Sequence, residues 1–105
     1  MTTKPGEVYI VDLGMVAKTR PMVIVSRHDP DPPRALVLCV PFTTQNRGSS
    51  YEVSLGKLRY LREESWANVQ GLVAVGTEKL ERRIGQLTAE QLGRVKSALR
   101  FALDM

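Results

Sequence analysis

Anion-binding side chains stand at the ends of two apolar segments of this chain. Arg20 begins RPMVIVS, whereas Thr43, Thr44 and Gln45 follow directly on ALVLCVP and its phenylalanine. Consecutive antiparallel strands usually pair, and the start of one then meets the end of the next, so we expect Arg20 and Thr43 at one sheet edge. A guanidinium that keeps its charge, beside a hydroxyl donor, could stabilise the charge of a phosphodiester. On the residues alone this stays one hypothesis among several, because threonines and Asn-Arg-Gly are also ordinary strand and turn material.

Other chemistries lack their motifs. The sequence has no glycine-rich phosphate loop, no HExxH, no paired cysteines and no GxSxG. His28 is the only histidine, which excludes a mechanism with two histidines, and a histidine in a Pro/Asp-rich loop is usually just solvated. The acid pairs Asp29/Asp31 and Glu63/Glu64 could bind a cation, but acids in loops are far more often solvated. We therefore predict no metal site.

Cysteine and aromatic residues are expected to be structural. Cys39 is the single cysteine, so no disulfide can form within the chain, and its apolar neighbours predict a small buried side chain. Trp66 and Tyr51 could stack on nucleic-acid bases, although aromatic residues in strands more often belong to the core.

The excess positive charge lies in the first part of the chain. The net charge is +4, and residues 1–62 carry nine Lys or Arg against five Asp or Glu, whereas residues 63–105 carry six of each. This distribution suggests a surface that faces a polyanion. A basic surface that serves solubility alone is about as consistent with the composition.

Hydrophobic periodicity predicts six short strands and one helix. The strands are expected at residues 7–13, 20–26, 35–42, 51–55, 65–69 and 72–75, the first of them half-buried. Thr88 and Gln91 have the spacing of a capping box, which predicts a helix over residues 88–103, and a shorter helical turn is expected at 77–83. The pattern predicts a mainly β domain over residues 1–105, with a small antiparallel barrel or curled sheet and a helix packed on it.

Size and hydropathy set the expected assembly and location. A domain of 105 residues has a modest core, which dimerisation could supplement. With no apolar run long enough for a bilayer and no basic apolar leader, we expect a cytoplasmic protein without a membrane partner.

Four segments resemble the MazF/PemK-type toxins of type II toxin–antitoxin systems, which are mRNA interferases. The segments are GEVYIVDL, KTRPMVIVS, CVPFTTQNRGSSYEVSL and LTAEQLGRVKSALRFAL, and together they span nearly the whole chain. The resemblance implies an SH3-like barrel with a C-terminal helix, usually a homodimer. It also implies a cognate acidic antitoxin as protein partner and single-stranded RNA as substrate.

The resemblance also implies a reaction and its residues. The family cleaves RNA sequence-specifically without metal or cofactor, leaving a 2′,3′-cyclic phosphate and a free 5′-hydroxyl. Carried over, Arg20 would stabilise the phosphorane charge and Thr43 would donate a hydrogen bond to a phosphate oxygen. The substrate-binding positions would be Lys18, Thr19, Thr44, Gln45 and Arg47.

Two segments depart from the family pattern. The loop before Arg20, GMVAKT, is shorter than is common in the family and offers Lys18 and Thr19 where family members often carry a glutamate, so a general base from this loop is not expected. An Asp-Gln or Glu-Gln followed by a basic residue is replaced by VQGLVAV, with Gly71 and Val73. Two other classes also stay open. One is a gyrase poison of the CcdB type, which shares the barrel, and the other is an SH3-like module that binds RNA without cutting it.

Overall fold

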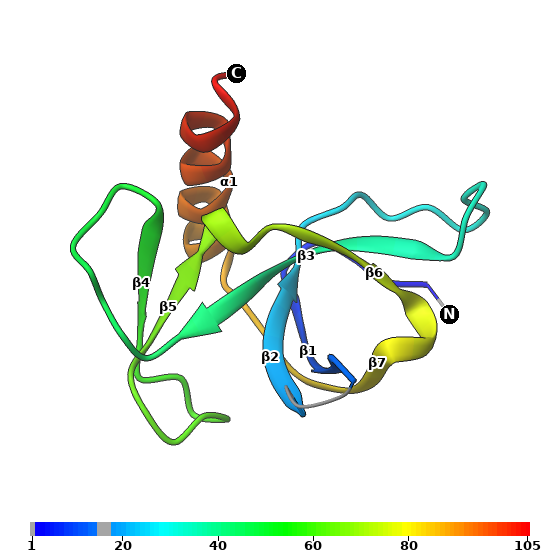
Figure 1. Cartoon of the computed structure of the whole chain (residues 1–105), viewed down its shortest axis with the longest axis horizontal. Coiled ribbons are helices and arrows are strands. Elements are labelled where there is room, and N and C mark those ends of the chain that lie inside the picture. Colours follow the sequence, from blue (N-terminus) through cyan, green and yellow to red (C-terminus); the bar gives the residue numbers. More distant parts are fainter. Residues whose placement is uncertain (1, 15–17) are drawn as a thin grey trace.

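The computed structural model describes residues 2–14 and 18–105 (Figure 1). Residues 15–17 of the connector before Arg20 lie outside the described part of the chain. The strands are β1 (Glu7–Asp12), β2 (Thr19–Ile24), β3 (Leu36–Thr43), β4 (Glu52–Gly56), β5 (Ser65–Asn68), β6 (Val73–Gly76) and β7 (Leu80–Gln86). Two 3₁₀ turns, η1 (Val69–Gly71) and η2 (Thr77–Lys79), and the helix α1 (Ala89–Leu103) complete the fold. The six predicted strands are confirmed, and β7 is an additional strand.

The strand β3 is the centre of an antiparallel sheet. The order is β4-β5-β3-β2-β1-β7, and β6 also pairs with β3. On one side β3 pairs with β2; on the other side its first half pairs with β6 and its last residues pair with β5. The end of β3 therefore lies between the start of β2 and the start of β5.

The sheet is strongly curled but does not close through hydrogen bonds. Strands β6 and β7 lie at opposite ends of the five-stranded part β6-β3-β2-β1-β7, and only the short turn η2 separates them in the chain. Figure 1 shows this part curling into a ring. Within residues 2–14 and 18–105, no ladder joins β7 to β6 or β4. The mainly antiparallel fold with a C-terminal helix is confirmed, whereas the closed barrel is not found.

Two hydrophobic cores share the central strands. Side chains of β1, β2 and β3 alternate between a core under α1, with Val8, Val23 and Val40, and a core inside the ring, which includes Ile24 and Cys39. The strand expected at 7–13 is present, but the expectation that only one of its faces is buried was wrong, because both faces of β1 are covered. Cys39 is fully buried as predicted, and this burial raises the pKa of its thiol to about 12.

The helix α1 begins at its predicted cap. The Gln91 backbone N–H donates to Thr88 Oγ1 at 3.1 Å, and the Thr88 N–H donates to Gln91 Oε1 at 2.8 Å. This reciprocal pair satisfies two N–H groups that have no partner within the helix. Val95 and Ala98 then lie on the buried face of the helix and join the first core. No helix in the part of the chain that the structure describes is long and apolar enough to cross a membrane.

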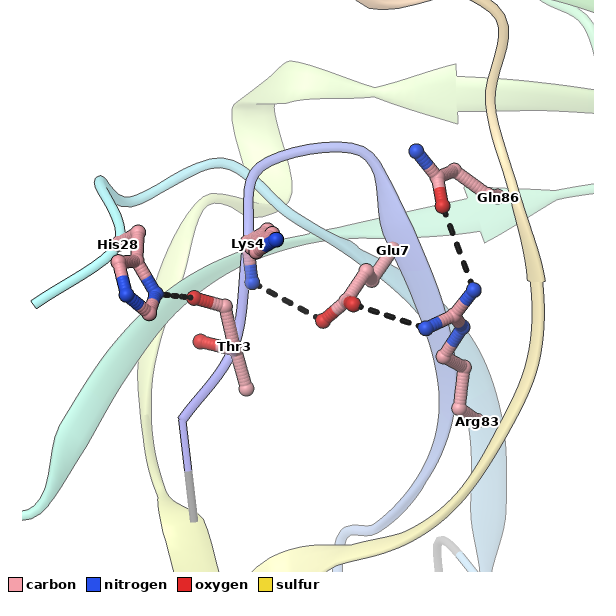
Figure 2. Close-up of polar contacts among 6 residues, drawn as sticks. All are labelled: Thr3, Lys4, Glu7, His28, Arg83 and Gln86. Atoms are coloured by element: carbon pink, nitrogen blue, oxygen red, sulfur yellow. Dashed lines mark hydrogen bonds and ion pairs between the residues drawn. The ribbon is translucent and has the colours of Figure 1, made fainter. Parts of the chain in front are cut away.

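The predicted helical turn at 77–83 is correct only for its first residues. Residues from Leu80 onward form β7, which pairs with β1, and Arg83 lies opposite Tyr9. Arg83 Nη1 donates to Glu7 Oε2 at 3.0 Å, and Glu7 is buried, with 7% of its surface exposed (Figure 2). Leucine, glutamate and arginine are good helix formers, but pairing with β1 overrides that local preference.

The N-terminal segment is fixed by polar contacts to the sheet and a loop (Figure 2). The Lys4 backbone N–H donates to Glu7 Oε1 at 2.9 Å, and His28 Nδ1 lies 3.0 Å from the Thr3 carbonyl oxygen. The Glu7 carboxylate thus bonds both the N-terminal turn and β7. Burial, and secondarily the nearby Glu7 charge, raise the pKa of Tyr9.

Candidate functional site

Arg20 and Thr43 come together at one edge of the sheet. In the β2–β3 ladder Met22 lies opposite Pro41, and the same register extended by two residues places Arg20 opposite Thr43. Both side chains line one pocket of about 480 Å³. The predicted meeting of these two residues is therefore confirmed as geometry.

Two parts of the chain form this pocket. One wall comes from the ends of β2 and β3 and consists of Arg20, Pro21, Phe42, Thr43, Thr44 and Gln45. The opposite wall precedes and begins β5 and consists of Leu61, Arg62, Glu63 and Ser65. The predicted residues Thr44 and Gln45 thus lie in the same pocket as Arg20.

The hydroxyl of Thr43 has a fixed position. The Gln45 backbone N–H donates to Thr43 Oγ1 at 3.1 Å, which forms a small turn at the end of β3. Because this bond uses an oxygen lone pair, the hydroxyl proton of Thr43 remains able to donate to a ligand. A guanidinium and a held hydroxyl on adjacent strands can bind two oxygens of one phosphate.

The wall formed by Leu61, Arg62, Glu63 and Ser65 was not predicted as part of the site. It is brought there by β3–β5 pairing, in which Thr43 lies opposite Trp66. Strands β3 and β5 are not consecutive in the chain. The rule that consecutive antiparallel strands pair, which predicted the contact of Arg20 with Thr43, therefore could not predict this wall. Glu63 is exposed, as expected of a solvated loop acid, and it is also among the residues that line the pocket. The only signal in the sequence is the charged run REE just before β5.

Internal hydrogen bonds hold this wall. The Leu61 N–H donates to the Leu58 carbonyl at 3.0 Å, and Lys57 Nζ donates to the Leu61 carbonyl. Ser65 Oγ donates to the Glu63 carbonyl at 3.1 Å, and Ser65 is 3% exposed.

The ring of Tyr60 also anchors the wall, by lying over Gly85 of β7. A Cβ at Gly85 would lie 2.3 Å from Tyr60 Cε1, so the ring occupies the space that a side chain would need. Its burial raises the pKa of the Tyr60 hydroxyl, and Tyr60 Oη has no hydrogen-bond partner among the described residues.

A second pocket of about 440 Å³ adjoins the first. Thr43 and Gln45 line both pockets, whereas the predicted residue Arg47 lines only the second, together with Ser49, Tyr51, Glu52, Asn68 and Gln70. The Glu52 carboxylate accepts hydrogen bonds from the Arg47 N–H at 3.1 and 3.2 Å and from the Ser49 N–H at 3.1 Å. These bonds, that of Ser49 first, lower the pKa of Glu52 and hold the 47–49 turn at the pocket.

Lys18 and Thr19 are not brought into either pocket. Thr19 begins β2 and lies opposite Asp12, and Lys18 adopts a left-handed backbone with φ of 64°. Neither is among the described residues that line the two pockets around Thr43. Their predicted role in substrate binding stays a prediction.

The remaining candidates lie outside the first pocket. His28 contacts the Thr3 carbonyl (Figure 2). Asp29 Oδ1 accepts a hydrogen bond from the Asp31 N–H at 3.0 Å within the same loop. The half-buried ring of Tyr51 packs on Phe101 of α1, with ring centroids 5.2 Å apart. In residues 2–14 and 18–105, no three His, Cys, Asp or Glu side chains gather as a metal site would require.

The unusual Gly71 has a packing reason. A Cβ at this position would lie 2.5 Å from Pro41 Cγ. Because it has no side chain, Gly71 lets η1 approach β3 closely at Pro41, two residues before Thr43.

Comparison with known proteins gives one family. A model of the family described as PemK-like, MazF-like toxin of type II toxin–antitoxin system matches residues 4–103. No match was found among curated protein sequences.

Several solved structures with the same fold come from mycobacteria. An endoribonuclease in complex with its cognate antitoxin is 27% identical, with a TM-score of 0.85 over 98% of this chain and 96% of that one. The Mycobacterium tuberculosis toxin MazF-mt6 is 28% identical, with a TM-score of 0.82 over 94% and 97% of the chains. A further mycobacterial endoribonuclease is 26% identical, with a TM-score of 0.82 over 98% and 92%.

Proposed function

This chain belongs to the PemK-like, MazF-like toxins of type II toxin–antitoxin systems, and from that premise we propose how it acts on RNA. It is an endoribonuclease, as are its mycobacterial relatives. Its substrate is single-stranded RNA, which it cleaves at a specific sequence without a metal ion. The products carry a 2′,3′-cyclic phosphate and a free 5′-hydroxyl.

The observation that carries this proposal is the pairing of Arg20 and Thr43 in one pocket. Cleavage by the neighbouring 2′-hydroxyl passes through a phosphorane that carries more negative charge on its oxygens than the starting phosphodiester. Arg20 stabilises this charge with planar donors that cannot lose their proton, and Thr43 donates from a position that the Gln45 N–H already holds. A substrate without a 2′-hydroxyl cannot react, so DNA is spared.

The second pocket is proposed to hold RNA next to the scissile phosphate. Thr43 and Gln45 line both pockets, so a strand bound at Thr43 can continue past Gln45 toward Arg47. The amide groups of Asn68 and Gln70 there can hydrogen-bond the edges of unpaired bases. Because Glu52 holds the backbone of the 47–49 turn, the Arg47 side chain remains available to a phosphate.

We further propose a homodimer and an acidic antitoxin as partners. The end of α1 exposes apolar side chains, with Phe101 57% and Leu103 53% exposed, and a second copy could cover them. A flexible acidic segment of the antitoxin would occupy the basic pockets in place of RNA. A mycobacterial relative is known in complex with its cognate antitoxin.

One experiment separates the nuclease from the two other classes. Purified protein is incubated with a long single-stranded RNA in EDTA, and the ends of the products are analysed. Fragments with cyclic-phosphate ends at a recurring sequence support the proposal. Intact RNA with a mobility shift would favour a module that only binds RNA, and intact RNA with inhibited gyrase would favour a gyrase poison.

A further inference from the structure

The pocket of Arg20 and Thr43 contains one carboxylate. Among the described residues that line it, Arg20 and Arg62 are cations, and Glu63 is the only acid. The other polar groups are hydroxyls and the Gln45 amide, which are poor proton acceptors near neutral pH. His28, the one histidine, contacts the Thr3 carbonyl outside this pocket. Among the described residues that line this pocket, Glu63 is therefore the side chain whose chemistry suits a general base.

Strand order places Glu63 and Arg20 on opposite sides of Thr43. The end of β3 lies between β2, which carries Arg20, and β5, whose Trp66 lies opposite Thr43. Neighbouring strands are about 4.8 Å apart, so β2 and β5 are roughly 10 Å apart with Thr43 between them. Glu63 lies two residues before the first residue of β5. A phosphate at Thr43 thus has a guanidinium on one side and a carboxylate on the other.

The backbone that carries Glu63 is ordered by its own contacts. The buried Ser65 donates to the Glu63 carbonyl at 3.1 Å, and Lys57 and Leu58 bond the Leu61 backbone. These bonds order the backbone at Glu63, and its exposed side chain is open to a bound substrate.

We propose that Glu63 is the general base of the reaction, an inference that rests on the proposed ribonuclease function. The Glu63 carboxylate takes the proton of the ribose 2′-hydroxyl, and O2′ forms a bond to phosphorus. The P–O5′ bond breaks, O5′ takes a proton from a water molecule, and the hydroxide so formed removes the proton from Glu63. Atoms and charges balance, and the products are the cyclic phosphate and the 5′-hydroxyl.

The charged groups that line this pocket with Glu63 are two arginines. Arg20 comes from β2, Arg62 is the residue before Glu63, and β3 and the residues that follow it contribute only the uncharged Thr43, Thr44 and Gln45.

Glu63→Gln tests the role with little change of shape, and Glu64→Gln is the matched control. Glu64 is the next residue, carries the same charge, is exposed and lies outside both pockets. Single-turnover cleavage in EDTA should fall about 10²–10⁴-fold in Glu63→Gln, as for a lost general base. Glu64→Gln should keep the cleavage rate of the wild type. Affinity for an RNA with a 2′-deoxy nucleotide at the cleavage site should be unchanged or tighter in Glu63→Gln.

Each other result rejects a defined part of the argument. A folded Glu63→Gln protein that keeps the wild-type rate overturns the proposal. So does one that cuts at full rate but at a different sequence, because Glu63 would then read a base. If the wild-type protein leaves RNA intact, the proposed ribonuclease function fails. If the wild type and Glu63→Gln both cleave RNA at the same rate, only the role of Glu63 fails.

Discussion

The Arg20 guanidinium is a permanent cation with planar donors, and it lies beside the Thr43 hydroxyl, which the Gln45 N–H already orients. If it stabilises charge that develops in the transition state, Arg20→Ala should lower single-turnover cleavage by about 10³-fold or more, yet weaken RNA binding far less. Arg20→Lys keeps the charge but loses the planar pair of donors, so it should recover little activity. Near wild-type cleavage by a folded Arg20→Ala protein would remove Arg20 from the mechanism.

Thr43→Val is the companion variant, because valine has nearly the same shape and lacks the hydroxyl. Loss of one oxyanion donor should cost about 10²–10³ in rate. Thr43 Oγ1 also accepts from the Gln45 N–H, so the melting temperature must be measured in parallel. A rate loss with unchanged melting separates the chemical role of the hydroxyl from its structural one.

Cys39 is buried against the ring core, and this gives a pH dependence. Burial raises the pKa of its thiol from the ordinary 9.0 to about 12, so the folded protein keeps the thiol neutral. Its contribution to stability should be complete below about pH 9 and lost as pH rises toward 12, because the unfolded thiol ionises first. Iodoacetamide at pH 8–9 should leave the native thiol unmodified and label one cysteine per chain in urea. Equal labelling rates in both states would contradict this burial.

At the scale of elements, the segment 57–64, which contains most of the pocket wall, packs through Tyr60 on a glycine of β7. Gly85→Ala would place a Cβ 2.3 Å from the Tyr60 ring, so the ring and the wall that carries Glu63 must move. We expect a loss of about 1–3 kcal/mol in the free energy of unfolding and a lower cleavage rate. Urea denaturation and cleavage assays measure the two effects.

Gly93→Ala is the matched control for that change. Gly93 is exposed within α1, and a Cβ there would meet no atom within 4 Å. The same substitution should therefore stabilise the protein by up to about 1 kcal/mol, through helix propensity alone. If both variants shift the denaturation midpoint alike, the contact of Tyr60 with Gly85 does not hold the wall.

Local signals in the sequence predicted some elements and could not predict others. Thr88 and Gln91 make a bond three residues apart, so the start of α1 is readable from the sequence. The strand state of β7 depends on Arg83 and Glu7, which are 76 residues apart, while the sequence around Arg83 favours a helix. The ladder between consecutive strands made the meeting of Arg20 and Thr43 predictable. The β3–β5 ladder joins non-consecutive strands, so the position of the pocket wall that contains Glu63 was not predictable from the sequence.

At the scale of the whole molecule, three of the nine basic residues in the first 62 positions line the two pockets where strand ends meet. Arg20 and Arg62 line the first pocket and Arg47 lines the second, with Thr43 between them. A disordered acidic chain can neutralise such a path over a large area, which a compact partner cannot do as easily. We therefore expect the antitoxin to bind across these pockets and to exclude RNA.

Two charge-neutralising variants test where the antitoxin binds. Arg62→Gln removes a charge from the pocket, whereas Arg34→Gln removes one from an exposed loop residue that lines neither pocket. Arg62→Gln should weaken the complex and make its affinity less dependent on salt, because fewer ion pairs form, while Arg34→Gln should change neither. Titration calorimetry at two salt concentrations gives both quantities. The bound antitoxin should also protect RNA and relieve growth arrest on co-expression; an antitoxin that binds tightly while RNA is still cut must lie elsewhere on the molecule.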